Sequence, residues 1–375
     1  MSSKRKIAIL SSFPGWLISD KIANPGGHYA VWLVSLYERF ATEDLPYEIH
    51  WISFQKNIKS VIREQHQGQF FHFIPLHSLR LAQLTRYIWQ GVQIKGEIKL
   101  INPDLIHAWG TEECYSWCVR NYHIPKIISM QGMLTAYSQR APMADFQVKQ
   151  AKLEQITLPK FKNITSESEW GVERCRELSP HSTIHQWDYA ANQRFFSTQR
   201  NLSDSPCCLL AGSDTPIKNV SCAIKAFSRP ALKHVKLYLA GISKSKYSNL
   251  PDNIIPLGRV SREEIEQLLA KSWCLVHPSL ADTCPNIVKE ARVMGVPAIV
   301  TTECGAKQYV IDGKSGYVIP CNDDKALASA VLKATESKNS SLTMGRYDLD
   351  RCRKALSSDT MYRQLVRLYN LILEG

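Results

Sequence analysis

Short apolar runs recur along the whole chain, and longer stretches with helical periodicity separate them. Antiparallel neighbours can be joined by a tight turn, whereas connections of this length are typical of parallel strands. We therefore expect an α/β protein with doubly wound parallel sheets of the Rossmann type. The expected strands are Ile7–Ser11, Ile49–Phe54, Leu105–Ala108, Lys126–Met130, Asn163–Ser166, Cys207–Ala211, Lys236–Ala240, Ile254–Leu257, Trp273–Pro278 and Ala298–Thr301.

A break in this alternation divides the chain near its middle. Residues 194–206 are polar and end in Ser-Asp-Ser-Pro, which predicts a linker. A length of 375 residues is too great for one ordinary core and fits two domains. We expect one domain over residues 1–195 and a second over residues 205–357. The last segment, residues 358–375, is predicted to be an amphipathic helix that Ser358 or Asp359 caps.

Charge and cysteine content limit the partners and the compartment. The net charge of +12 favours an anionic partner, such as a phosphorylated substrate, an acidic membrane surface or a nucleic acid, although solubility alone also explains it. The eleven cysteines include no C-x-x-C pair, which indicates free thiols in a reducing cytoplasm. No window approaches the apolar length that spans a bilayer. We expect a cytoplasmic protein, and peripheral contact with the inner face of a membrane stays open.

The segment over residues 277–301 carries the clearest indication of a ligand site. A strand leads into a loop with Asp282, and Glu290 follows eight positions later, in a helix that begins near Asn286. Both carboxylates then lie at the carboxyl end of a strand, where open α/β sheets bind ligands. Backbone N–H groups at the helix start can hold phosphate or sugar oxygens, and Glu290 can accept hydrogen bonds from a ribose. The spacing alone also fits a turn residue and a solvated charge.

A fuller pattern surrounds these two acids. It consists of Pro278-Ser279, Asp282, Glu290-Ala291 and Gly295-Val296-Pro297. This pattern resembles the signature of the retaining glycosyltransferases of family 4. The resemblance implies the GT-B fold, in which two Rossmann-like domains face each other across a cleft and a C-terminal helix returns to the N-terminal domain. The first acid of that signature is usually Glu, so the shorter Asp282 keeps the charge but moves it.

Further segments resemble the same family and extend the implied donor site. Lys218 falls on the family's phosphate-loop lysine, and Ser213 stands where arginine is common. Gln131 replaces a histidine near the transferred sugar, and an amide cannot act as an acid or base. The resemblance implies catalytic roles for Asp282, Glu290 and Lys218, and donor contacts from Gly26, Gly27, Gln131, Ser213, Lys218, Arg259, Val260, Thr283, Cys284, Asn286, Ile287 and Glu290.

By the same resemblance, the chain transfers a hexose-type sugar from a UDP- or GDP-sugar, with retention, to a glycan, lipid-linked or other acceptor of polysaccharide or lipopolysaccharide biosynthesis. No metal and no separate cofactor is implied. Asp348-Leu349-Asp350 lacks the strand context of a metal-binding Asp-x-Asp. Three alternatives stay open: an epimerase of the same fold, a sugar-nucleotide-binding protein without catalysis, and a glycosyltransferase acting on nucleic acid. The last of these would lack a recognised nucleic-acid motif.

Overall fold

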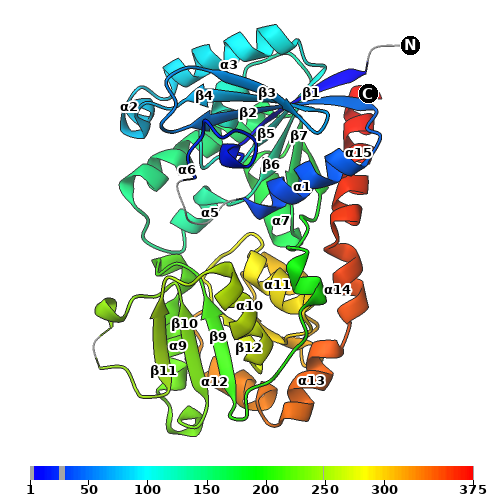
Figure 1. The fold of residues 1–375 in the computed structure, drawn as a ribbon. Coiled ribbons are helices and arrows are strands. Elements are labelled where there is room, and N and C mark those ends of the chain that lie inside the picture. Colours follow the sequence, from blue (N-terminus) through cyan, green and yellow to red (C-terminus); the bar gives the residue numbers. More distant parts are fainter. Residues whose placement is uncertain (1–3, 25–29, 248, 375) are drawn as a thin grey trace.

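The computed structural model describes residues 4–24, 30–247 and 249–374, which form two stacked α/β units (Figure 1). The first unit has an eight-stranded sheet with the order β3-β4-β2-β1-β5-β6-β7-β8, in which only the edge pair β3–β4 is antiparallel. Its strands are β1 Arg5–Leu10, β2 Tyr47–Gln55, β3 Ile62–His66, β4 Gln69–Pro75, β5 Leu105–Trp109, β6 Lys126–Met130, β7 Asn163–Ser166 and β8 Thr183–Gln186. Its helices are α1 Val31–Thr42, α2 Leu79–Leu84, α3 Ile88–Ile101, α4 Tyr115–Val119, α5 Leu134–Ser138, α6 Asp145–Thr157 and α7 Glu169–Leu178.

Both faces of the first sheet are buried. On one face, Ile7 and Ile9 of β1 pack with α1 and with the C-terminal helix α15 (Ser358–Glu374). On the other face, Ala8 and Leu10 of the same strand pack with α3 and neighbouring helices. Successive side chains of a strand point to opposite faces, so a strand that is apolar throughout is typical of a parallel sheet between two helix layers.

The second unit has a six-stranded parallel sheet with the order β11-β10-β9-β12-β13-β14. Leu209 and Leu275 pack with helices α10, α11 and α14 on one face, and Cys208 and Leu210 pack with α9 and α12 on the other. Its strands are β9 Cys207–Ala211, β10 Lys236–Ala240, β11 Ile254–Gly258, β12 Cys274–His277, β13 Ala298–Thr301 and β14 Gly316–Ile319. Its helices are α8 Arg194–Ser197, α9 Val220–Phe227, α10 Arg262–Lys271, α11 Asn286–Val293, α12 Asp324–Ala334, α13 Lys338–Arg346 and α14 Leu349–Ala355.

The C-terminal helix α15 returns to the first unit and lies beside α1 (Figure 1). Met361, Leu365 and Leu368, which share one helix face, are buried in the first unit's core. The Ser357 hydroxyl accepts a hydrogen bond from the Thr360 N–H at 3.1 Å. The capping residue is therefore one position earlier than the predicted Ser358. None of the helices in the described ranges is both long and apolar enough to cross a membrane.

The predicted α/β architecture is confirmed. The strands that the prediction missed lie at the edges of the two sheets or, for β4, next to an edge. The sequence prediction did not include β3, β4, β8 and β14. Of these, the edge strand β3 (Ile62–His66) is polar and has no apolar run. The predicted linker is wrong at its start, since Phe195 of α8 is fully buried in the second unit. Arg200 also donates hydrogen bonds to the carbonyl oxygens of Gly295 and Ser272. The domain boundaries at residues 195, 205 and 357 stay a prediction.

Candidate active site

Loops from the carboxyl ends of both sheets meet between the two units. In the second sheet, Asp282 follows β12; in the first, Gln131 follows β6 and Glu167 follows β7. The ammonium nitrogen of Lys289, on α11, lies 2.5 Å from a carboxylate oxygen of Glu167 and joins the two units. The carboxyl ends of parallel strands are where open α/β sheets bind ligands, so the predicted donor segment lies in a suitable place.

The loop that carries Asp282 is fixed by the neighbouring loop after β13. The Asp282 N–H donates to the Glu303 carbonyl at 3.1 Å, and its carbonyl accepts from the Gly305 N–H at 2.8 Å. A Cβ on Gly305 would lie 1.8 Å from the carbonyl oxygen of Thr283, which is closer than two non-bonded atoms can approach. Only glycine at position 305 permits this approach.

Lys218 and His277 both bind the carboxylate of Asp282. The Lys218 Nζ donates to Asp282 Oδ2 at 2.5 Å, and His277 Nε2 lies 3.0 Å from the same oxygen. Burial alone would raise the pKa of Asp282, but the Lys218 charge and the His277 hydrogen bond outweigh it and hold that pKa well below its usual range. Burial lowers the pKa of His277, so the imidazole is neutral at pH 7. Asp282 is therefore a carboxylate that holds a cation at the strand end.

Glu290 has a cationic partner that the sequence did not reveal. Its carboxylate accepts from the Arg262 guanidinium at 3.1 Å. Glu290 is 6% exposed, and burial raises its pKa despite the Arg262 charge. Arg262 was missed because it lies in the first turn of α10, just after the Ser261 cap, and looks like an ordinary helix-surface charge. Arg259, which was predicted as a donor contact, is exposed.

Thr283 is already engaged by the first unit. Its backbone N–H donates to the Tyr137 hydroxyl at 3.0 Å, and the two hydroxyl oxygens are 2.8 Å apart. The Ser168 hydroxyl donates to the Thr283 carbonyl at 2.6 Å. In this arrangement Thr283 binds the first unit rather than presenting its N–H to a ligand. Of the other predicted donor residues, Ser213 is exposed, Val260, Asn286 and Ile287 are partly buried, and Cys284 is buried in the core.

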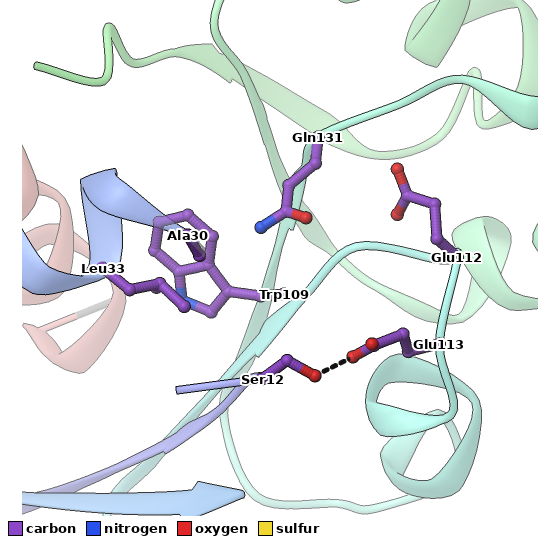
Figure 2. Close-up of a pocket in the computed structure, with 7 residues that line it drawn as sticks. All are labelled: Ser12, Ala30, Leu33, Trp109, Glu112, Glu113 and Gln131. Carbon is purple, nitrogen blue, oxygen red and sulfur yellow. Dashed lines mark hydrogen bonds between the residues drawn. The ribbon is translucent and has the colours of Figure 1, made fainter. Parts of the chain in front are cut away.

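A pocket of about 150 Å³ lies in the first unit at the ends of β1, β5 and β6 (Figure 2). Figure 2 shows the amide of Gln131 directed into it between Trp109 and Glu112. The Ser12 hydroxyl donates to the Glu113 carboxylate at its edge. The lining residues are Ser12, Ala30, Leu33, Trp109, Glu112, Glu113 and Gln131. The pocket is polar on the side of the two glutamates and apolar on the side of α1.

Glu112 was missed by the sequence prediction, although it follows a strand end that the family resemblance included. Two glycines make room for its side chain: a Cβ on Gly110 or on Gly132 would lie 2.4 or 2.5 Å from a Glu112 oxygen. The Thr111 N–H donates to Glu112 Oε2 at 3.0 Å. Burial raises the pKa of Glu112 to about 7, and the nearby Glu154 adds to this. The pocket thus holds a carboxyl group that titrates near neutral pH.

Several other predicted features have no part in this geometry. Gly26 and Gly27 lie outside the described residues. His107 is fully buried between the Tyr369 hydroxyl at 2.7 Å and the Ser129 hydroxyl at 2.6 Å, which agrees with a structural role. Asp348 pairs with Arg351 at 2.6 Å, within the second unit. Among the residues that the structure describes, no group of three or more His, Cys, Asp or Glu side chains is placed to hold a metal ion.

One protein-family model matches the second unit. Residues 192–350 match the model described as glycosyl transferases group 1. This segment, which is less than half of the chain, is similar to the glycosyl transferases group 1 family. The matched residues include Lys218, Asp282 and Glu290, and thus every residue for which a catalytic role was expected.

Known proteins agree with this family and with the GT-B fold. The lipopolysaccharide glucosyltransferase WaaG of Escherichia coli K12 is 26% identical over 185 residues, which are 46% of this chain and 50% of WaaG. The match spans half or less of the curated relatives' own length. Sucrose-phosphate synthase from Thermosynechococcus elongatus superposes with a TM-score of 0.79 at 17% identity and 99% coverage of both chains. Anabaena HepE in complex with UDP and glucose gives 0.68 at 14% identity, covering 98% of this chain and all of HepE.

Proposed function

We propose that this protein is a retaining glycosyltransferase that moves a hexose-type sugar from a UDP-sugar to a glycan or lipid-linked acceptor of cell-surface polysaccharide or lipopolysaccharide assembly. The observation that carries the proposal is the Lys218 ammonium, held 2.5 Å from Asp282 at the carboxyl end of the second sheet. A fixed cation at this place stabilises the negative charge that develops on a leaving diphosphate. The ion pair of the buried Glu290 and the partly buried Arg262 joins two helices of the same unit.

The two units have separate tasks in this proposal. The second unit binds the nucleotide: the Glu290 carboxylate accepts hydrogen bonds from ribose hydroxyls, and Arg262 holds that carboxylate in place. The first unit receives the acceptor in the pocket with Gln131 and Glu112. Tyr137 connects them, because its ring lies beside Gly132, the residue after Gln131 of the pocket, and its hydroxyl binds Thr283.

In the proposed reaction, the bond between the anomeric carbon and the diphosphate oxygen breaks while a bond to the acceptor oxygen forms on the same face. The proton of the acceptor hydroxyl passes to the leaving phosphate, and Lys218 stabilises that leaving group. Gln131 donates or accepts hydrogen bonds with the sugar but moves no proton. Asp282 acts through its two partners, since its Oδ2 is bound by Lys218 and His277.

The choice of donor follows from the relatives. HepE contains UDP and glucose in its solved complex, and WaaG is a glucosyltransferase of lipopolysaccharide. A GDP-sugar is the alternative to test. Thermal unfolding with UDP, GDP and their glucose and mannose conjugates separates the two, because a ligand that binds only the native state raises its stability by about 2.7 kcal/mol at roughly a hundred times its Kd. Product analysis with and without acceptor then separates transfer from epimerisation.

Replacing Glu290 by Gln should weaken binding of the nucleotide strongly. The variant removes the charge that binds the ribose and the ion pair between Glu290 and the partly buried Arg262. We expect UDP affinity to fall about 10- to 100-fold, as for the loss of a charge-assisted hydrogen bond of about 1.5–3 kcal/mol. Isothermal titration calorimetry with UDP measures this. The control is Glu263→Gln, a 61% exposed carboxylate on α10, which should bind UDP as the parent does. Unchanged UDP binding by Glu290→Gln would show that the nucleotide site lies elsewhere.

The pH dependence of transfer should report Glu112. Its raised pKa of about 7 means that the charged form predominates only above neutral pH. A carboxylate accepts a sugar hydroxyl more strongly than a carboxylic acid does, so the rate should rise from pH 6 to pH 8. Glu112→Gln has no such ionisation, and its profile should be flat over that range. If the rate of Glu112→Gln rises with the same midpoint, the ionisation belongs to another group.

A further inference from the structure

Helices α2 and α3 present large apolar side chains to solvent. Of the fourteen exposed large hydrophobic residues in the described ranges, seven lie between residues 79 and 100. Leu84, Ile88 and Trp89 are 70%, 67% and 65% exposed. We call these three residues, with Leu79, Leu81 and Val92, the α2–α3 surface. Exposed apolar residues scattered singly are ordinary, whereas a contiguous group marks an interaction site.

The core contacts of α3 determine which of its side chains face solvent. Its other face is anchored in the first unit's core through Ile94, Ile98 and Ile101. The helix has 3.6 residues per turn, so Ile88 and Val92 must point away from that core. Figure 1 shows α3 at the end of the first unit that is farthest from the second sheet. A groove of about 450 Å³ between α2 and α3, lined in part by Leu81, Trp89 and Val92, adds apolar area at this place.

The charges that residues 65–96 contribute to the α2–α3 surface have one sign. Residues 65–96 contain no Asp or Glu, while Arg80, Arg86 and Lys95 are exposed among the apolar side chains. The next carboxylate along the chain, Glu97, is buried and turned inward to His72 at 2.8 Å and Arg63 at 2.6 Å. An apolar surface interspersed with cations alone is complementary to an anionic lipid surface, where both the acyl chains and the headgroups find partners.

We propose that the α2–α3 surface docks the protein onto an anionic bilayer, with Leu84, Ile88 and Trp89 inserted between the headgroups and Arg80, Arg86 and Lys95 on the lipid phosphates. Tryptophan is suited to this boundary because its ring is apolar and its N–H is polar. The docking does not depend on the identity of the transferred sugar. It holds the first unit, and with it the acceptor pocket, at the membrane surface.

The test is flotation or co-sedimentation of the full-length protein with vesicles of phosphatidylcholine alone and of phosphatidylcholine mixed with phosphatidylglycerol. We expect binding to the mixed vesicles that weakens as salt is added. A charge variant, Arg80→Gln/Arg86→Gln/Lys95→Gln, should lower the partition coefficient about a hundredfold, because each cation contributes roughly 1 kcal/mol at such a surface. An apolar variant, Leu84→Ser/Ile88→Ser/Trp89→Ser, should lose binding as well.

The matched control is Leu371→Ser, which removes a 60% exposed leucine from α15 and should bind as the parent does. UDP-induced thermal stabilisation, measured for each variant, verifies that the protein is folded and keeps the two proposals separate. No binding of the parent to the mixed vesicles would overturn the proposal, as would binding of either triple variant that equals the binding of the parent. Self-association of the parent that the apolar variant abolishes would also overturn it, since the surface would then join two copies of the chain.

Discussion

Replacing Lys218 by Met should lower the rate of sugar transfer about 10²- to 10³-fold, the range measured when one fixed group that stabilises transition-state charge is removed. The Lys218 ammonium is three-quarters buried and is held by the Asp282 carboxylate at 2.5 Å, so it is oriented before the donor arrives. A cation that is already in place stabilises the departing diphosphate without reorganisation. Most of the loss should therefore lie in kcat, with a smaller change in the KM for the donor.

Single-turnover transfer with saturating UDP-sugar measures this effect apart from binding. Lys218→Arg keeps the charge but changes the shape of the cation, so we expect it to recover part of the rate. Lys225→Met, an exposed lysine on α9, is the control and should be as active as the parent. The thermal stability of the Lys218 variants should be measured as well, because Lys218→Met leaves the carboxylate of the buried Asp282 with His277 as its remaining side-chain partner. Full activity of a folded Lys218→Met protein would contradict the proposed role.

The sequence predicted the strand before Asp282 and the helix with Glu290 because both depend on local pattern. The strand before Asp282 is a continuous apolar run, and Glu290 falls on the helix that begins at Asn286, as expected. The sequence did not predict how the charges pair. Lys218 and Asp282 are 64 positions apart, and nothing in the spacing decides between Asp282 and Glu290 as the partner of Lys218. That choice is made by the packing of the η3 turn (Pro216–Lys218) against the loop after β12.

Glu112 was missed for a related reason. In the sequence it is one of two adjacent glutamates after a strand, and adjacent residues look equivalent there. In the fold they differ, because Glu112 lies against Gly110 and Gly132 from two neighbouring strands, while Glu113 turns to Ser12. The polar strand β3 was missed because it pairs only at an edge, where one face needs no apolar side chains. Contacts between distant segments decide all of these features.

Replacing Glu167 by Gln should destabilise the native state by about 3–5 kcal/mol, the range found when one partner of a buried ion pair is removed. The Lys289 side chain has no exposed surface, and its Nζ lies 2.5 Å from Glu167 Oε2 and 3.2 Å from the Tyr189 carbonyl. Burial lowers the pKa of Lys289, but the Glu167 carboxylate more than offsets this and keeps the ammonium charged. Without that carboxylate, the buried charge keeps the Tyr189 carbonyl as its hydrogen-bond acceptor but loses its ion pair with Glu167.

Denaturant unfolding followed by tryptophan fluorescence measures the change. Glu173→Gln, a 60% exposed carboxylate beside Arg174, is the control and should alter stability by less than about 1 kcal/mol. The double variant Glu167→Leu/Lys289→Met should recover most of the loss, because it removes both charges and fills the space with apolar side chains. Since Glu167 is on the first unit and Lys289 is on α11 beside Glu290, the single variant should also weaken UDP binding. A single variant that is as stable as the double variant would show that Lys289 finds another partner and that the two units are held together elsewhere.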